Sequence, residues 1–155
     1  MRSIIVYCSK TGNTEKVAHA ILDGVQGQAD IIKLELTHSG LLKDFQSAFT
    51  FDFSDYDTIF LGGWVMMMSV HPFLSSYINS CGSFEGKKVV CFITGAAIFS
   101  KGHVYRDLKK LVEAKGGYLP IEHFLYVTTL FGPLLTKNKL KKAVAFARGF
   151  FYIPK

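Results

Sequence analysis

Residues 9–14 form a short polar segment whose side chains suit the binding of an anion. In order, they are Ser9, Lys10, Thr11, Gly12, Asn13 and Thr14. Four of them offer hydroxyl or amide groups, one is a cation, and the glycine lets the backbone curl closely around a ligand. If a helix begins at this point, its free N–H groups and partial positive charge favour a phosphate dianion. Thr14 or Asn13 would also cap that helix. The alternative interpretation is an ordinary capped helix in a polar turn.

The flanking residues predict the strand and the helix that such a segment needs. Residues 3–8 are a β-branched-rich run of strand length, and residues 13–26 repeat apolar side chains at helical spacing. Further strands are predicted at 29–36, 58–62, 87–94 and 121–129, further helices at 71–80, 104–115 and 137–150, and a weak helix or irregular connector at 41–50. Because the strands are nearly continuous apolar runs separated by helices, the pattern indicates a parallel sheet covered on both faces.

The composition is that of one globular domain. The chain has 155 residues, of which 49% are hydrophobic and 19% are charged, which excludes intrinsic disorder. No apolar run reaches the roughly 20 residues of a membrane-spanning helix, and no signal peptide is evident, so we expect a cytoplasmic protein. Three cysteines without a CxxC spacing fit a reducing compartment. Cys8 and Cys91 are expected in the core, whereas Cys81 ends a predicted helix, where it could be exposed.

Residues 5–14, with the sequence IVYCSKTGNT, are followed by Ala18 and Ile21 and together resemble the signature of the flavodoxin family. The resemblance extends in order and length over essentially the whole chain, so it implies a single flavodoxin-like domain, residues 1–155, of the short-chain type. It implies an α/β fold with a five-stranded doubly wound parallel sheet of strand order 2-1-3-4-5. It also implies FMN as the cofactor, with the phosphate in the first loop and the flavin ring between two later loops.

The first of these ring loops follows the third predicted strand, at residues 62–72. Trp64 stands where the family carries an aromatic side chain that stacks on the flavin, and the alternative is a core tryptophan. The glycine pair before it would let a ligand approach the backbone closely. Residues 66–68 are three methionines, of which we expect one or two to pack on the ring edge or to form a docking patch. His71 is interpreted as a polar helix start rather than as a proton donor.

The second ring loop follows the fourth predicted strand, at residues 94–100, where small side chains suit contact between the backbone and the pyrimidine edge of the ring. The cofactor-binding residues that the resemblance implies are Ser9, Lys10, Thr11, Gly12, Asn13, Thr14, Gly63, Trp64, Val65, Met66, Met67, Thr94, Gly95, Ala96 and Ala97. No metal-ligand cluster and no set of acid, base and nucleophile stands out, so no catalytic residue is predicted.

The charge is distributed unevenly along the chain. Residues 1–86 hold 5 Lys and Arg against 9 Asp and Glu, and residues 87–155 hold 13 against 3, so the two parts carry −4 and +10. Such asymmetry indicates an anionic partner, either an acidic redox protein or an anionic membrane surface, unless the basic residues merely form solvated helix faces. Nucleic acid is not expected, because the basic residues lie mostly on predicted helices without interleaved aromatic side chains.

The leading hypothesis is an FMN-dependent electron carrier that moves electrons between a reductase and acceptor enzymes through the exposed edge of the ring. The alternative is a turnover enzyme of the same fold, a flavin-dependent quinone reductase or one resembling the protoporphyrinogen oxidases, acting at a membrane surface. The basic C-terminal half and the apolar residues 131–135 and 150–153 favour that alternative. A third hypothesis, a binding module that has lost the cofactor, is disfavoured by the intact polar segment at residues 9–14.

Positive charge near the second ring loop predicts an unusual reduction potential. The resemblance implies acidic residues there, whereas this sequence has Lys101, His103 and Arg106 and no acidic residue before Asp107. Because positive charge favours the anionic, fully reduced flavin, we expect a low-potential couple that is less negative than is usual for the family. A spectroelectrochemical titration measures this couple, and a strongly negative value would contradict the expectation.

Overall fold

The computed structural model describes residues 2–26, 28–35, 51–129 and 135–150, so the predicted connector at 41–50 lies outside the described residues. The strands are β1 (Ser3–Tyr7), β2 (Ala29–Lys33), β3 (Thr58–Met66), β4 (Ser69–Val70), β5 (Lys88–Gly95) and β6 (Phe124–Thr128). The helices are α1 (Asn13–Gly24), α2 (Pro72–Ser80), α3 (Lys101–Glu113) and α4 (Lys137–Arg148), with short 3-10 turns at Ile98–Ser100 and Ile121–His123.

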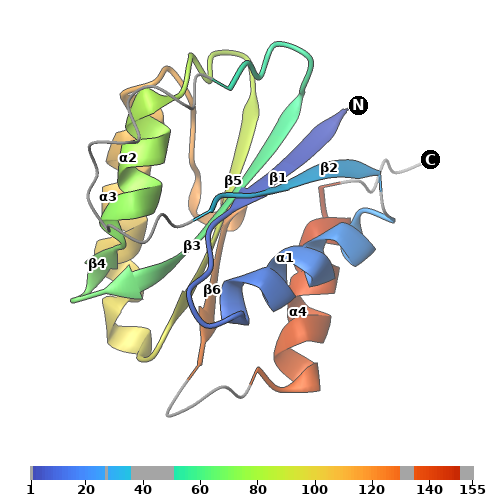
Figure 1. The fold of residues 1–155 in the computed structure, drawn as a ribbon, viewed down its shortest axis with the longest axis vertical. Coiled ribbons are helices and arrows are strands. Elements are labelled where there is room, and N and C mark those ends of the chain that lie inside the picture. Colours follow the sequence, from blue (N-terminus) through green and yellow to red (C-terminus); the bar gives the residue numbers. More distant parts are fainter. Residues whose placement is uncertain (1, 27, 36–50, 130–134, 151–155) are drawn as a thin grey trace.

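A parallel sheet forms the middle of the molecule, with strand order β2-β1-β3-β5-β6 (Figure 1). When the short antiparallel strand β4 is left out, this is the order 2-1-3-4-5, and the expected fold is confirmed. Ile5 of β1 pairs with Ile31 of β2 on one side and with Phe60 of β3 on the other. Strand order reverses between β1 and β3, and ligands of such sheets bind beyond the carboxyl ends of the strands at that point.

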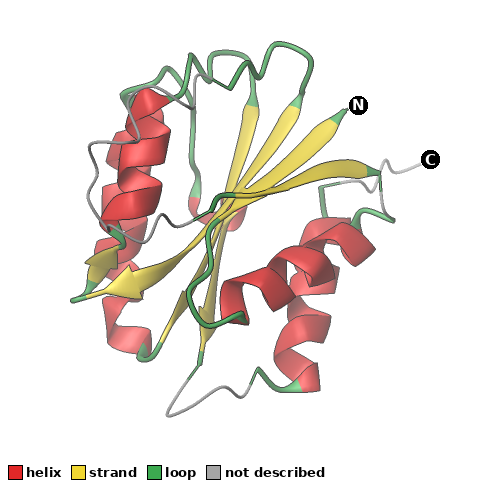
Figure 2. Ribbon diagram, viewed as in Figure 1, coloured by secondary structure: helices red, strands yellow, loops and turns green. Residues whose placement is uncertain are grey.

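Helices cover both faces of the sheet, α1 and α4 on one face and α2 and α3 on the other (Figure 2). Alternate residues of each strand supply the two cores. On β1, Ile5 belongs to the core that contains Val17 of α1, whereas Ile4 belongs to the core that contains Leu74 of α2. All four side chains are fully buried. Because both faces of the central strands β1, β3 and β5 are covered, their sequences are largely apolar instead of alternating with polar residues.

Several element boundaries differ from the prediction, and three of the differences have a local cause in the structure. β3 continues four residues further, to Met66, because its last residues pair with β4 in a hairpin. α3 begins three residues earlier, at Lys101, since a 3-10 turn leads directly into it. β6 begins three residues later, at Phe124, because a 3-10 turn follows Pro120.

Cys81, expected at a position that could be exposed, is buried, and Phe150, expected at a membrane-facing surface, is half-buried. Cys81, directly after α2, is only 3% exposed and belongs to the core beneath α2 and α3. Phe150, assigned to a membrane-facing segment, packs its ring edge-on against Phe60 and close to Phe146. Most of that segment and of the segment at 131–135 lies outside the described residues. Within the part of the chain that the structure describes, no helix has the length and apolar character needed to cross a membrane.

Candidate functional site

The loop between β1 and α1 curls at the end of the sheet where the strands finish (Figure 1). Gly12 lies directly before the helix with φ +87°, a left-handed conformation that L side chains rarely adopt. Its N–H donates a hydrogen bond to Ser9 Oγ over 3.1 Å, which closes the loop. A β-carbon on Gly12 would meet no atom within 4 Å, so the loop opens to free space at this point. This geometry agrees with the backbone curl that the sequence predicts.

The first turn of α1 presents backbone donors beside that space. The Lys16 N–H donates to Gly12 O, and no described residue accepts a hydrogen bond from the N–H groups of Asn13, Thr14 or Glu15. Asn13 Oδ1 is also buried without a partner among the described residues. The residue at the cap position is Gly12, so the expectation that Asn13 or Thr14 caps the helix is wrong. The free N–H groups fit a phosphate dianion, and the unpartnered amide fits a ligand that offers both donors and acceptors.

A buried hydrogen-bond junction joins three segments of the site. Thr14 Oγ1 lies 2.9 Å from Thr94 Oγ1 and donates to Gly63 O over 3.2 Å. Thr94 Oγ1 lies 3.5 Å from the same carbonyl oxygen, and both threonines are buried. This threonine junction (Thr14, Thr94 and Gly63 O) ties the start of α1 to the ends of β3 and β5. It also turns inward two hydroxyls that the sequence analysis assigned to the cofactor.

A second set of polar contacts fastens the same turn of α1 to the sheet. The Glu15 carboxylate accepts a hydrogen bond from Tyr7 Oη over 3.0 Å and pairs with Lys33 Nζ at 3.2 Å. Hydrogen bonds from Lys33 and then from Tyr7 hold the pKa of Glu15 below its usual value. Burial, followed by the bond to Glu15, raises the pKa of Tyr7 to about 12. An ionised Glu15 in the first turn also complements the helix dipole.

Trp64 lies near the end of β3, half-buried against the core. Its indole faces the imidazole of His71, with ring centroids 4.2 Å apart and the planes inclined by 30°. The His71 N–H donates to Trp64 O over 2.9 Å, and His71 Nδ1 accepts from the Phe73 N–H over 3.1 Å. His71 therefore caps α2, and its interpretation as a helix start is confirmed. Trp64 is held in place on one side of its ring without being fully enclosed.

β3 and β4 form a hairpin whose turn consists of Met67 and Met68, with Met66 paired to Ser69. Both turn residues have positive φ, 48° and 70°, the signs of a type I′ turn that favours Asn-Gly. The left-handed conformation costs a residue with a side chain about 1–2 kcal/mol. Met67 is 90% exposed at the tip of the hairpin, so its side chain stands clear of the loop at the start of α1. The prediction that Met67 contacts a cofactor gains no support from this placement.

The glycines of the two ring loops make room for the protein's own side chains. A β-carbon on Gly63 would lie 2.8 Å from Leu74 Cδ2, and one on Gly95 would collide with the phenol of Tyr126. At both positions the missing side chain faces the interior. The close approach of a ligand to the backbone of these glycines stays a prediction.

The loop after β5 is anchored by a residue that the sequence analysis missed. Tyr126 Oη of β6 donates to Ala97 O over 2.7 Å. Ser100 Oγ lies 2.6 Å from Tyr126 Oη and donates to the same carbonyl over 2.9 Å. The signal in the sequence was the phenol of Tyr126 in a largely apolar strand, because a covered hydroxyl needs a hydrogen-bond partner. Ala96 is exposed on this loop, where its backbone is open to a ligand.

The predicted site residues occupy three places in the structure. The polar loop and the first turn of α1 contain Ser9, Lys10, Thr11, Gly12, Asn13 and Thr14. The ends of β3 and β5 contain Gly63, Trp64, Val65, Thr94 and Gly95. The β3–β4 hairpin and the loop after β5 contain Met66, Met67, Ala96 and Ala97. The first two groups are brought together, because Trp64 pairs with Thr94 and the threonine junction links both strands to α1.

The sequence model of one family, described as a flavodoxin domain, matches residues 4–118. This chain belongs to the flavodoxin family. The matched residues run from β1 through α3 and include the polar loop, the threonine junction and the β3–β4 hairpin. As a family, flavodoxins bind a flavin, usually FMN, and carry electrons.

Similar proteins support the family and the fold. The chain is 39% identical over 66 residues to the flavodoxin-like domain-containing protein BilS of Clostridioides difficile (strain CD3); this match covers 42% of the chain and only 32% of the relative's own length. Oxidised flavodoxin 2 from Bacillus cereus matches with a TM-score of 0.69 and 19% identity, over 97% of this chain and 98% of its own. Oxidised flavodoxin 1 from the same organism matches with a TM-score of 0.68 and 18% identity, over 97% of each chain. At these identities the solved structures show the fold alone.

Removing one hydroxyl from the threonine junction should destabilise the protein. Thr14→Val keeps the shape of the side chain but leaves Thr94 Oγ1 and Gly63 O buried with one partner fewer. We expect the free energy of unfolding, measured by urea denaturation, to fall by about 1–3 kcal/mol. Thr11→Val removes an exposed hydroxyl from the same loop and should change it by less than about 0.5 kcal/mol. Equal effects of the two substitutions would contradict the role of the junction.

Protonation of His71 should also destabilise the fold. Burial and then the charge of Lys10 hold the pKa of His71 below its usual value, so the unfolded chain binds the proton more tightly. The stabilisation is complete above about pH 6.5 and is lost as the pH falls through the lower pKa of the folded state. His71→Asn keeps a capping acceptor without titrating. From about pH 7 to 5.5, the free energy of unfolding of the His71→Asn variant should fall less than that of the unsubstituted protein. Parallel plots of unfolding free energy against pH for the two proteins would contradict this.

Proposed function

We propose that this protein binds FMN beyond the carboxyl ends of β1, β3 and β5 and carries single electrons between a reductase and acceptor proteins. The observation that carries the proposal is the start of α1, where three backbone N–H groups lack a partner among the described residues and Gly12 opens to free space. These donors suit a phosphate. Membership of the flavodoxin family supports a flavin as the group that bears it.

The residues present fit each part of FMN. Ser9, Lys10 and Thr11 precede the N–H groups that suit the phosphate, and their hydroxyl and ammonium groups are donors that a phosphate can accept from. Trp64 offers a half-buried indole for an offset stack with a flat ring, while His71 supports it. Exposed backbone groups at Ala96 suit the polar pyrimidine edge.

When bound, FMN supplies the redox chemistry by accepting and releasing electrons. The chain's own residues bind the cofactor and orient it. The polar loop neutralises the phosphate, and Trp64 keeps water from one side of the ring position. The threonine junction holds the polar loop at a fixed distance from the ends of β3 and β5, and Tyr126 does the same for the loop after β5. A partner therefore meets the cofactor in one orientation.

The alternative, an enzyme at a membrane surface, rests on the basic C-terminal half and on the apolar residues 131–135 and 150–153. Only Leu135 and Phe150 of these lie within the described residues, and both are partly covered. The Phe150 ring packs against the core residue Phe60. The described residues thus add no observation in favour of that alternative.

A charge placed in the polar loop tests the phosphate site. Thr11→Glu puts a carboxylate on an exposed position beside the free N–H groups, so the affinity for FMN should fall about tenfold or more. The affinity for riboflavin, which lacks the phosphate, should stay within about twofold. Flavin fluorescence quenching measures both dissociation constants. Gln28→Glu makes the same charge change at an exposed position beyond the other end of α1 and is the matched control.

Two results would overturn the proposal. Purified protein that excludes FMN in gel filtration would leave the flavodoxin fold without its cofactor. An equal loss of FMN and riboflavin affinity in Thr11→Glu would show that the loop does not hold the phosphate. Steady turnover of a quinone with a nicotinamide donor would favour the enzyme over the carrier.

A further inference from the structure

An apolar patch projects from the molecule beside the proposed flavin site. It consists of Met66, Met67 and Met68 in the β3–β4 hairpin and of Ile98 and Phe99 in the turn after β5, and we call it the methionine patch. Met67 is 90% exposed and Phe99 is 70% exposed. Large apolar side chains that are exposed together mark an interaction site, and methionine adapts its shape to a partner.

The hairpin and the turn after β5 lie side by side. Trp64 of β3 pairs with Thr94 of β5, and a β-carbon on Gly95 would lie 2.8 Å from Val65 Cγ2. The first residues of the patch follow directly on these neighbours along both strands. Figure 1 shows the hairpin projecting at the left of the sheet beside α3, which packs against β4. The two halves of the patch therefore belong to one surface.

At two places on this surface, the residues present do not suit the local structure and reduce the stability of the fold. Met67 and Met68 occupy left-handed conformations that glycine or asparagine would adopt more easily. Lys101 begins α3 with no acidic residue in the first turn and no side-chain cap, although the helix dipole favours acidic residues there. Such conflicts between local preference and structure concentrate at functional sites.

The border of the patch is basic. Lys101, His103 and Arg106 are exposed in the first turns of α3. Segments 8–16, 63–72 and 95–107 lie at this end of the molecule, and their carboxylates are Glu15, already paired with Lys33, and Asp107. A further carboxylate, Glu35, follows β2 and acts on Tyr7.

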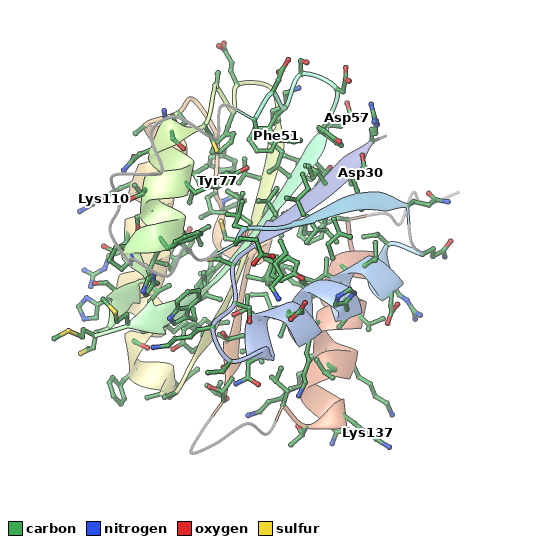
Figure 3. The ribbon with its side chains drawn as sticks, viewed as in Figure 1. Asp30, Phe51, Asp57, Tyr77, Lys110 and Lys137 are labelled. Atoms are coloured by element: carbon green, nitrogen blue, oxygen red, sulfur yellow. The ribbon has the colours of Figure 1, made fainter. Side chains whose placement is uncertain are left out.

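Carboxylates gather instead at the end of the sheet where the strands begin. Asp30 and Asp57 both contact Arg2 there, and Figure 3 shows them at the upper right, while β4 lies at the lower left. The charges of the molecule thus present a positive border around an apolar patch, next to the proposed flavin site. The complementary surface is acidic with an apolar centre.

We propose that the methionine patch and its basic border dock an acidic electron-transfer protein. This inference rests on the proposed function, since electron transfer requires the partner's redox centre to come close to the flavin. The occupant is a folded protein and not a lipid surface because the patch adjoins the loops of the flavin site. A bilayer that covered the patch would also cover the edge of the ring through which electrons leave.

Stopped-flow mixing tests the charge of the partner. Reduced holoprotein is mixed with oxidised cytochrome b5, an acidic electron carrier, and separately with oxidised cytochrome c, a basic one. The rate constant with cytochrome b5 should fall as ionic strength rises, whereas that with cytochrome c should stay constant or rise. The reverse pattern would overturn the inference.

Substitutions in the hairpin test the apolar centre. Met67→Asn with Met68→Gly installs the pair that a type I′ turn prefers, so the melting temperature should stay constant or rise. The rate with cytochrome b5, divided by the rate with ferricyanide, should fall about tenfold because the partner loses an apolar contact. Phe99→Ser should lower the same ratio. Ile121→Ser removes a 54% exposed apolar side chain before β6 and is the matched control, with an unchanged ratio.

Cross-linking gives a readout that does not depend on electron transfer. A carbodiimide joins a lysine to a carboxylate without a spacer, so it should link Lys101 to cytochrome b5, and the yield should drop in the hairpin double variant. Links that avoid Lys101, or an unchanged yield in that variant, would overturn the docking surface.

The outcomes separate this inference from the proposed function. If the protein excludes FMN, the proposed function is contradicted, and cross-linking still decides whether the surface docks an acidic protein. Protein that binds FMN and reduces ferricyanide, but keeps the full cytochrome b5 ratio in the hairpin double variant, fails the docking inference alone. Co-sedimentation with phosphatidylserine vesicles that is lost in the same variant would assign the patch to a lipid surface and overturn the protein partner.

Discussion

The hydrogen bonds among Thr14, Thr94 and Gly63 O are the contacts on which the geometry of the candidate site depends. They join three segments that are far apart along the chain, at the point where α1 starts and β3 and β5 end. In a buried, low-dielectric setting each hydroxyl must keep its partner or incur the cost of an unpaired polar group. These hydrogen bonds therefore restrict the movement of the three segments relative to one another. The polar loop and the strand ends consequently form one rigid frame for a ligand.

The fold could be predicted from the sequence because buried parallel strands and amphipathic helices leave strong local patterns. The site could be predicted only where local rules decide it, as at Gly12, whose backbone curl depends on its own residue type. Residue type does not show whether a hydroxyl faces in or out, so the inward bonds of the Thr14 and Thr94 hydroxyls were not predicted. Tyr126 was missed because its partners come from a distant loop. The hairpin turn was missed because Met-Met carries none of the usual turn signals.

The extension of β3 changes how an aromatic side chain is presented. Trp64 belongs to a strand that pairs with β5 on one side, and its carbonyl accepts a hydrogen bond from His71. A side chain on a paired strand is placed more reproducibly than one on a free loop. The imidazole that supports the indole also caps α2, so the orientation of Trp64 is coupled to the start of that helix. A site assembled in this way needs little rearrangement to receive a flat ring.

The three thiols of the chain, Cys8, Cys81 and Cys91, are all buried, the first and last of them as predicted. Burial raises the pKa of Cys8 and that of Cys81 to about 12. At neutral pH about one molecule in 10⁵ then carries a thiolate at either position. The thiolate is the form that peroxide oxidises and that exchanges with disulfides. The three sulfur atoms are therefore both hidden from oxidants and chemically unreactive at neutral pH.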